Sequence, residues 1–254
     1  MSEKKEHGAL YLVGTPIGNL KDISFRALEV LRQVNLIAAE DTRHTRKLLS
    51  HYDIHTPLTS FHEHNEKKKA PSLIRKLKDG QSIALVSDAG MPGISDPGFY
   101  LVKLAVENNL KIVAIPGPCA LILALVVSGF STESFVFEGF LGRTSKERRK
   151  KLTKLINEER TIILYEAPHR ISKLLPQIRE ILGDRHIVIG REMTKRFEEI
   201  IRGRISEVEK IFKDKKPRGE FTLVIEGKQA LDTPEDSVRI KRKDESIYCN
   251  RTSR

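Results

Sequence analysis

The sequence predicts an α/β fold, because short apolar runs alternate with segments whose apolar residues recur three and four positions apart. The runs at 9–14, 36–40, 57–61, 82–87 and 111–116 have the composition of strands. The stretches 23–34, 45–52, 70–80 and 97–109 have helical spacing. Apolar strands separated by helices indicate a mostly parallel sheet covered on both faces.

The same alternation resumes after the apolar stretch PGPCALILALVVSGF. Strands are expected at 134–140, 160–166, 186–192, 198–204 and 221–227, and helices at 145–159, 171–182 and 205–212. Some antiparallel pairing is expected near the end of this second α/β unit. We therefore predict an N-terminal α/β domain at 8–118, a C-terminal α/β domain at 119–228, and a polar, flexible tail at 229–254.

Composition limits the class of protein. Hydrophobic residues make up 39% of the chain, and the net charge of +11 with a pI near 9.6 favours a polyanionic partner such as nucleic acid. No segment has the length of apolar residues that a membrane span needs, and the charged start lacks a signal peptide. Cys119 and Cys249 have no metal-ligand spacing, so no metal is expected. These features predict a cytoplasmic protein.

Three loops rich in Gly and Pro follow predicted strands. They are GTPIGNL after 9–14, DAGMPGISDPG after 82–87, and PGPCAL after 111–116. Ligands of open α/β sheets bind outside the carboxyl ends of the strands, so these loops indicate one shared ligand site. Asp88, directly after its strand, is the better ligand contact, whereas Asp96 before Pro97 is expected to cap a helix. The absence of GxxxxGK[ST] and GxGxxG argues against an NTPase and a dinucleotide enzyme.

Longer blocks resemble the tetrapyrrole-methylase superfamily. They are LYLVGTPIGNLKDISFRALEVL, LIAAEDTRHTRKLL, FHEHNE, VSDAGMPGISDPG, IPGPCAL, FVFEGFLGR, YEAPHR, REMTKRFEE and GEFTLVIEG, and they extend from Ala9 to Gly227. Within this superfamily, the chain most resembles the members that 2′-O-methylate a cytidine ribose of small-subunit (16S) ribosomal RNA. Met91 and Cys119 stand where those members would be expected to have Thr and Ser.

The resemblance implies a two-domain fold, each domain a mixed sheet flanked by helices, with S-adenosylmethionine in the cleft between them. It also implies a homodimer whose partner is small-subunit ribosomal RNA or the assembled subunit. Backbone contact with the cofactor would explain the small, rigid residues of the loops. The positions of this sequence that the resemblance implies bind the cofactor are Pro16, Asp88, Gly90, Met91, Gly93, Cys119, Ala120, Tyr165 and Glu166.

A ribose hydroxyl is barely ionised at neutral pH, so methyl transfer to it benefits from a nearby base. Asp41 and His44 follow the second strand, His62 lies in FHEHNE, and Glu192 follows a strand of the second half. These four are the predicted catalytic residues. For Asp41 a helix cap explains the residue equally well, and for His62 a surface loop is the alternative.

Basic residues near the same loops are predicted to hold RNA phosphates. The run LGRTSKERRKKLTK is the clearest group, although a solvated helix face would have the same pattern. The predicted RNA contacts are Arg43, Arg143, Arg148, Arg149, Lys150, Arg170, Arg191 and Lys195. Two alternatives remain: a small-molecule methylase acting on a tetrapyrrole precursor, and a non-catalytic RNA-binding factor of ribosome assembly.

Overall fold

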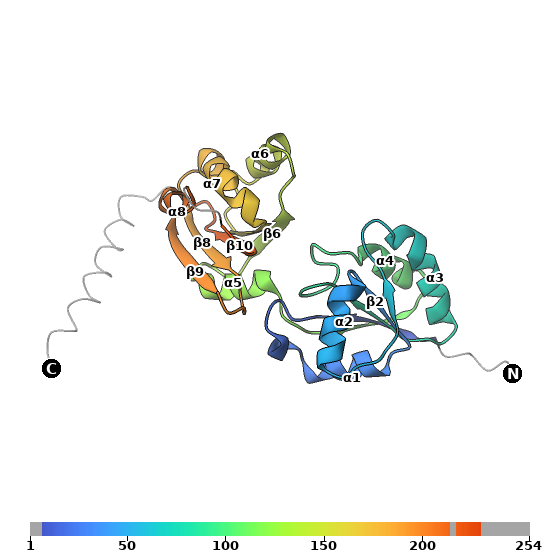
Figure 1. The fold of residues 1–254 in the computed structure, drawn as a ribbon. Coiled ribbons are helices and arrows are strands. Elements are labelled where there is room, and N and C mark those ends of the chain that lie inside the picture. Colours follow the sequence, from blue (N-terminus) through green and yellow to red (C-terminus); the bar gives the residue numbers. More distant parts are fainter. Residues whose placement is uncertain (1–6, 214–216, 230–254) are drawn as a thin grey trace.

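The computed structural model describes residues 7–213 and 217–229; the tail predicted at 229–254 lies outside these residues, apart from Gln229. The described chain forms two five-stranded sheets, one from each half of the sequence. Figure 1 shows the first sheet and its helices on the right and the second on the left. The predicted α/β class is confirmed.

The first sheet has the strand order β3-β2-β4-β1-β5. Its strands are β1 (Ala9–Val13), β2 (Leu36–Ala39), β3 (Leu58–Ser60), β4 (Ile83–Val86) and β5 (Lys111–Ile115). All pair in parallel, so their carboxyl ends lie at one edge of the sheet. The loops predicted to share a ligand site therefore emerge together.

Helices cover both faces of this sheet because successive strand residues point to opposite sides. Ala84 and Val86 pack with α1 (Phe25–Gln33) and α2 (Thr42–His51), whereas Ile83 and Leu85 pack with α3 (Glu66–Lys78) and α4 (Phe99–Glu107). A short 3₁₀ turn, η1 (Leu20–Asp22), lies in the first loop. Every residue of β4 is buried, which explains its continuous apolar sequence.

The second sheet is mixed, with the order β6-β7-β10-β8-β9. Its strands are β6 (Phe135–Phe140), β7 (Thr161–Glu166), β8 (His186–Arg191), β9 (Glu199–Arg204) and β10 (Phe221–Ile225). β6 and β7 are parallel, while β10 is antiparallel to both β7 and β8. The antiparallel pairing expected near the end of the chain is confirmed. β6, β7 and β8 end at the edge where β10 begins.

Of the helices in the described residues, one covers one face of the second sheet and three cover the other. α5 (Ala120–Ser128) packs on one side through Leu121, Ala124 and Leu125. The other side carries α6 (Ser145–Lys154), α7 (Pro168–Leu182) and α8 (Ile205–Phe212). The chain crosses between the sheets in the short segment between β5 and α5. A division into independent domains at residues 118 and 119 stays a prediction.

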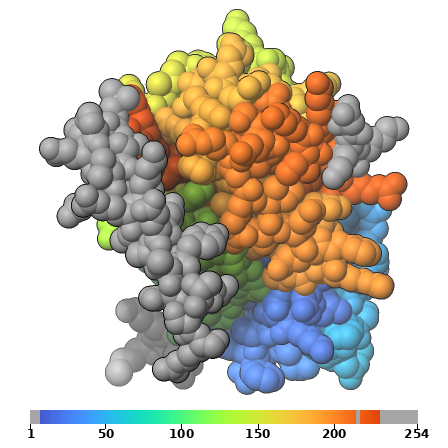
Figure 2. All heavy atoms as spheres, turned by 90° about the vertical axis from the view of Figure 1, so that its left-hand side faces the viewer, coloured from blue at the N-terminus to red at the C-terminus, as the bar shows by residue number. Residues whose placement is uncertain are grey.

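The two halves contact each other directly. In Figure 2 the orange atoms of the second half lie against the blue atoms of the N-terminal residues, in line with the packing of the Lys195 side chain on the backbone of Gly18. Within the described residues, no helix is both long and apolar enough to cross a membrane.

Candidate active site

A pocket of about 360 Å³ lies where the ligand-facing edges of the two sheets meet. The first half contributes the loops after β1, β2 and β4. The second half contributes the start of α5 and the adjoining ends of β6, β7 and β10. The lining residues are Ile17, Glu40, Asp88, Ala89, Gly90, Met91, Ile94, Ser95, Asp96, Cys119, Ala120, Phe140, Tyr165, Glu166, Ala167, Pro168, Glu220, Phe221 and Thr222.

Close backbone contacts hold the loops of the first half together. Thr15 and Gly90 exchange two backbone hydrogen bonds, of 2.9 and 3.0 Å. Gly14 and Gly117 approach so closely that a Cβ on Gly14 would lie 2.7 Å from the Cα of Gly117. Gly90 has φ +85°, a conformation that favours glycine. Glycine is therefore needed here for geometry, because the loops pack backbone against backbone.

The predicted cofactor-binding residues mostly come together in this pocket. Asp88, Gly90, Met91, Cys119, Ala120, Tyr165 and Glu166 line it, whereas Pro16 and Gly93 do not. Pro16 lies between Thr15, which pairs with Gly90, and Ile17, which lines the pocket. Gly93 is exposed, with φ +85°, in the following turn. Their roles in binding stay predictions.

Tyr165 connects the second sheet to the start of α5. Its hydroxyl oxygen accepts a hydrogen bond from the Leu121 N–H at 3.1 Å, and burial raises the pKa of this phenol. Cys119 is the N-cap residue of α5 and makes no side-chain capping bond. Because the first N–H groups of a helix have no partner within it, the start of α5 can offer donors to a ligand.

Carboxylates dominate the charge of the pocket. Glu40, Asp88, Asp96, Glu166 and Glu220 line it, and no Lys or Arg of the described part of the chain is among the lining residues. Burial, followed by repulsion from Glu40, raises the pKa of Asp96 to about 7. Burial also raises the pKa values of Glu40 and Glu166. Such a site attracts a cationic ligand and holds a carboxyl group that exchanges a proton near neutral pH.

The loop after β2 is tied to the loop after β4. The Asp41 N–H donates to Oδ1 of Asp88 at 3.0 Å, and the Asp88 N–H donates to Oε2 of Glu40 at 3.3 Å. The Asp41 side chain caps α2 by accepting from the Arg43 N–H at 2.8 Å. It also pairs with the Arg43 guanidinium, and these bonds hold the Asp41 pKa well below its usual range. Asp41 thus has the capping role that the sequence left open.

None of the four predicted catalytic residues lines the pocket. His44 is exposed on α2, and half-buried His62 has Nε2 2.9 Å from Nδ2 of Asn65. Glu192 Oε1 accepts from Nζ of Lys195 at 2.9 Å and from the N–H of pocket residue Glu220 at 3.0 Å. Glu192 therefore supports the pocket edge, and the proton-transfer roles of all four stay predictions.

Several predicted RNA contacts already have partners in the structure. Arg149 makes two 2.6 Å hydrogen bonds to Glu180, and Arg191 pairs with Glu199 at 3.0 Å. Lys195 contacts both Glu192 and Glu220, and Arg43 pairs with Asp41 as described above. Arg143 and Lys150 are exposed, whereas Arg148 is buried. Arg143, Arg148 and Arg170 line a second pocket, described below.

Sequence reasoning missed three of the pocket carboxylates as site residues. Glu40 directly follows β2, so the rule that selected Asp88 could have selected it. Asp96 was expected to cap a helix, but the N-cap of α4 is Gly98. Glu220 precedes β10 and reaches the site only because that strand is antiparallel to β7. Among the described residues, no group of three or more His, Cys, Asp or Glu is placed to hold a metal ion.

The fold, with its pocket between two α/β sheets, defines one class of protein. Comparison with known sequences identifies that class. The chain belongs to the Tetrapyrrole (Corrin/Porphyrin) Methylases, whose family model matches residues 9–209. A relative from Synechocystis sp. is 52% identical over 90% of this chain and 81% of its own length, and one from Bacillus subtilis is 50% identical over 92% and 80%. Both are named ribosomal RNA small subunit methyltransferase I, and the chain belongs to that branch of the family.

Solved structures share the fold at low sequence identity. Diphthine synthase has a TM-score of 0.67 at 15% identity, with 87% of this chain and 91% of that chain covered. Cobalt precorrin-4 methyltransferase has a TM-score of 0.61 at 17% identity, covering 86% and 94%. A uroporphyrin-III C-methyl transferase from Thermus thermophilus, complexed with S-adenosyl homocysteine, has a TM-score of 0.59 at 14% identity, covering 85% and 97%.

Proposed function

We propose that this protein transfers a methyl group from S-adenosylmethionine to the 2′-hydroxyl of a cytidine in small-subunit ribosomal RNA, in the cytoplasm. The observation that carries the proposal is the acid-lined pocket between the sheets, in a chain about half identical to proteins named for small-subunit rRNA methylation. The S-adenosyl homocysteine bound to a structural neighbour is the compound that S-adenosylmethionine becomes after it gives up its methyl group.

The residues of the pocket fit this donor. S-adenosylmethionine supplies an electrophilic methyl group on a positively charged sulfur. Glu40, Asp88 and Asp96 surround the pocket with negative charge, which favours a cation over the neutral thioether left after transfer. The absence of a Cβ at Gly14 and Gly117 lets the loops after β1 and β5 pack directly against each other, beside the pocket residue Met91. The same charge preference would assist release of the product.

Asp96 is the carboxylate that we propose accepts the proton of the ribose hydroxyl. Its pKa of about 7 lies near the working pH, where a general base is most effective. In the transfer, the hydroxyl oxygen bonds to the methyl carbon as the carbon–sulfur bond breaks, and the hydroxyl proton moves to the Asp96 carboxylate. The pocket walls contribute by holding the reacting atoms in line.

We also propose that the protein is a homodimer that uses α5 at its interface. This helix is apolar on all sides, and only one of its faces packs on the second sheet. Ile122, Val126 and Val127 are 42%, 61% and 39% exposed on the other face. A neighbouring set of exposed apolar side chains is typical of a protein–protein contact.

The test is transfer of labelled methyl from S-adenosylmethionine to small ribosomal subunits from cells lacking this gene, with the product mapped by nuclease digestion and mass spectrometry. The expected result is one 2′-O-methylated cytidine. Naked rRNA tested in parallel distinguishes the free RNA from the assembled subunit as substrate. No transfer to either, with cofactor binding intact in calorimetry, would overturn the proposal in favour of a small-molecule substrate. No cofactor binding would favour a non-catalytic RNA-binding factor.

A further inference from the structure

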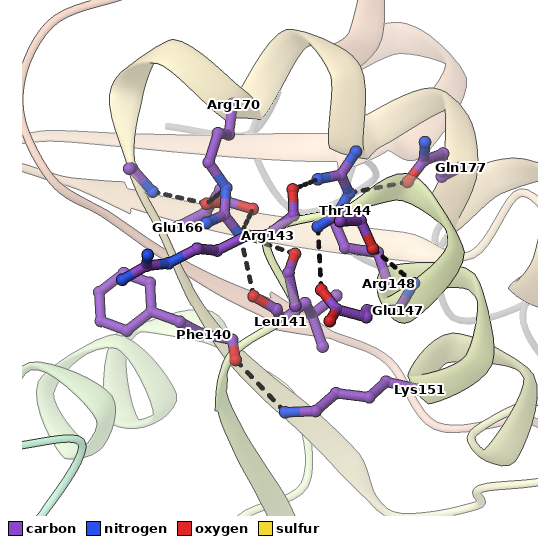
Figure 3. Close-up of polar contacts among 12 residues, drawn as sticks. Phe140, Leu141, Arg143, Thr144, Glu147, Arg148, Lys151, Glu166, Arg170 and Gln177 are labelled. Carbon is purple, nitrogen blue, oxygen red and sulfur yellow. Dashed lines mark hydrogen bonds and ion pairs between the residues drawn. The ribbon is translucent and has the colours of Figure 1, made fainter.

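A second pocket, of about 470 Å³, has only basic side chains among the described residues that line it. It lies where α6 and α7 begin. The lining residues are Arg143, Arg148, His169, Arg170 and Lys173. Figure 3 shows the contacts that hold Arg148 and Arg170 in this region. A concave surface with this concentration of positive charge favours an anion.

Arg148 is buried without a carboxylate partner. It is 7% exposed, and its Nη1 and Nε donate to the Arg143 carbonyl at 2.9 Å and to Oε1 of Gln177 at 3.0 Å. Both acceptors are neutral, and within residues 7–213 and 217–229 Arg148 forms no ion pair. A buried charge without an opposite charge is unfavourable, so a bound anion would stabilise it.

The start of α7 adds positive potential to the same place. The helix begins at Pro168 after an N-cap, Ala167, that makes no side-chain capping bond, and its first turn contains no acidic residue. His169 and Arg170 lie instead at this positive end of the helix dipole, where cations are disfavoured. Helix N-termini are natural binding sites for phosphate groups.

The basic pocket adjoins the acidic one. Glu166, Ala167 and Pro168 line the acidic pocket, and the next two residues along the chain, His169 and Arg170, line the basic one. Nη2 of Arg170 is fixed by the Leu141 carbonyl at 2.9 Å, and its Nε lies 2.8 Å from Oε1 of Glu166. A nucleic acid strand with one ribose at the acidic pocket would therefore have a neighbouring phosphate near the basic pocket.

We propose that the basic pocket at the starts of α6 and α7 binds one backbone phosphate of the RNA next to the methylated nucleotide. Arg143, His169 and Lys173 contact the phosphate, and Arg148 and Arg170 are held in place to supply charge. This assignment rests on the proposed function. It adds two residues, His169 and Lys173, that sequence reasoning did not select, and it gives the RNA a fixed register relative to the cofactor.

The test compares Arg143→Gln and Lys173→Gln with Lys210→Gln in the full-length protein. All three residues are exposed, so each change removes one charge without disturbing the core, and Lys210 lies on α8 outside both pockets. The first probe is an RNA oligonucleotide spanning the mapped cytidine, with single linkages replaced in turn by neutral methylphosphonate. Binding is measured without cofactor over a range of salt concentrations.

The expected result is that the effects of one neutralised linkage and of a pocket variant on RNA binding do not add. Neutralising that linkage should weaken wild-type binding about tenfold and hardly weaken the Lys173→Gln variant further, because the contact is already lost. Each pocket variant should also lower the salt slope by about 0.7, the value for one phosphate contact on a single strand. Pocket variants that bind every oligonucleotide as tightly as Lys210→Gln would overturn the assignment.

Two further experiments distinguish failure of the phosphate-pocket assignment from failure of the proposed function. Inorganic phosphate should compete weakly with RNA; tight phosphate binding lost in Lys173→Gln, with RNA binding unchanged, would assign the pocket to a free anion and overturn the RNA contact. If no methyl transfer to RNA is found, the proposed function fails, and the assignment is tested with a 12-residue oligocytidine in place of the mapped sequence. Equal salt slopes for the pocket variants and Lys210→Gln on that probe would overturn it.

Discussion

Oε1 of Glu166 lies 2.8 Å from Nε of Arg170, and this ion pair joins the acidic pocket to the basic one. The Glu166 side chain is fully buried and that of Arg170 is 18% exposed. Burial nevertheless raises the pKa of Glu166, because desolvation outweighs the attraction of Arg170. The pair therefore holds one wall of each pocket in place. Removing either partner would leave the other charged group without an opposite charge.

Arg170→Ala should lower the free energy of unfolding by about 3 kcal/mol near neutral pH, because it leaves a buried carboxylate unpaired. The loss should shrink as the pH falls through the Glu166 pKa, since the protonated acid no longer needs a partner. Urea unfolding at several pH values measures both effects. In the double variant Glu166→Gln/Arg170→Ala the loss should be smaller at neutral pH; an equal loss would show that the charge of Glu166 is not the cause.

Binding of S-adenosylmethionine should weaken as the pH falls from 8 to 6. Asp96, with a pKa of about 7, is mostly ionised at pH 8 and mostly protonated at pH 6, so the pocket loses one negative charge. Losing one charge near a cation corresponds to about 1 kcal/mol in a water-like dielectric, or about fivefold in affinity. Calorimetry at both pH values measures this change. Asp96→Asn controls for titration of the ligand itself, and an identical pH dependence in that variant would contradict the prediction.

Asp96→Asn should also stabilise the protein at pH 8 while it weakens the cofactor site. The folded-state pKa of Asp96 is raised above the ordinary value, so its stabilising effect is complete only below that ordinary value and is lost as the pH rises through 7. Replacing the carboxylate removes this penalty. Thermal unfolding at pH 8 and pH 4 measures the gain, which should be larger at pH 8. A gain of the same size at both pH values would point to packing instead.

Gly14→Ala should distort the acidic pocket that we propose binds the cofactor. The new methyl group would lie 2.7 Å from both the Gly117 Cα and the Met91 Sδ, so the backbone of one loop must move. Gly117→Ala produces the reciprocal collision with Gly14 and should have the same effect. We expect at least a tenfold loss of cofactor affinity in each, measured by calorimetry on variants whose folding is checked by circular dichroism. Wild-type affinity in both would contradict the role given to this contact.

Val126→Asp should convert the proposed homodimer to a monomer, because it places a charge in the apolar face of α5. Val106→Asp is the matched control, since Val106 on α4 is 61% exposed, the same fraction as Val126. Sedimentation velocity at several protein concentrations measures the oligomeric state. Dimers of equal stability in both variants would place the interface elsewhere, and a monomeric wild type would contradict the dimer itself.

The sequence alone determined the alternation of strands and helices and the edge at which the loops meet. These features depend on local periodicity and on the rule that parallel strands end together, as the loops at Gly14, Asp88 and Gly117 illustrate. Seven of the nine cofactor-binding positions that the motif blocks indicated likewise line the pocket.

Only the tertiary structure decided which charged side chains are free to contact a ligand and which are paired with each other. Arg149 and Glu180 lie on different helices, and Glu220 reaches the pocket through an antiparallel strand, so no local pattern predicts either arrangement. The burial that shifts the Asp96 pKa and leaves Arg148 among neutral partners also depends on packing between distant segments. Periodicity predicts which face of an element is buried, but charge pairing and desolvation depend on which elements that face meets.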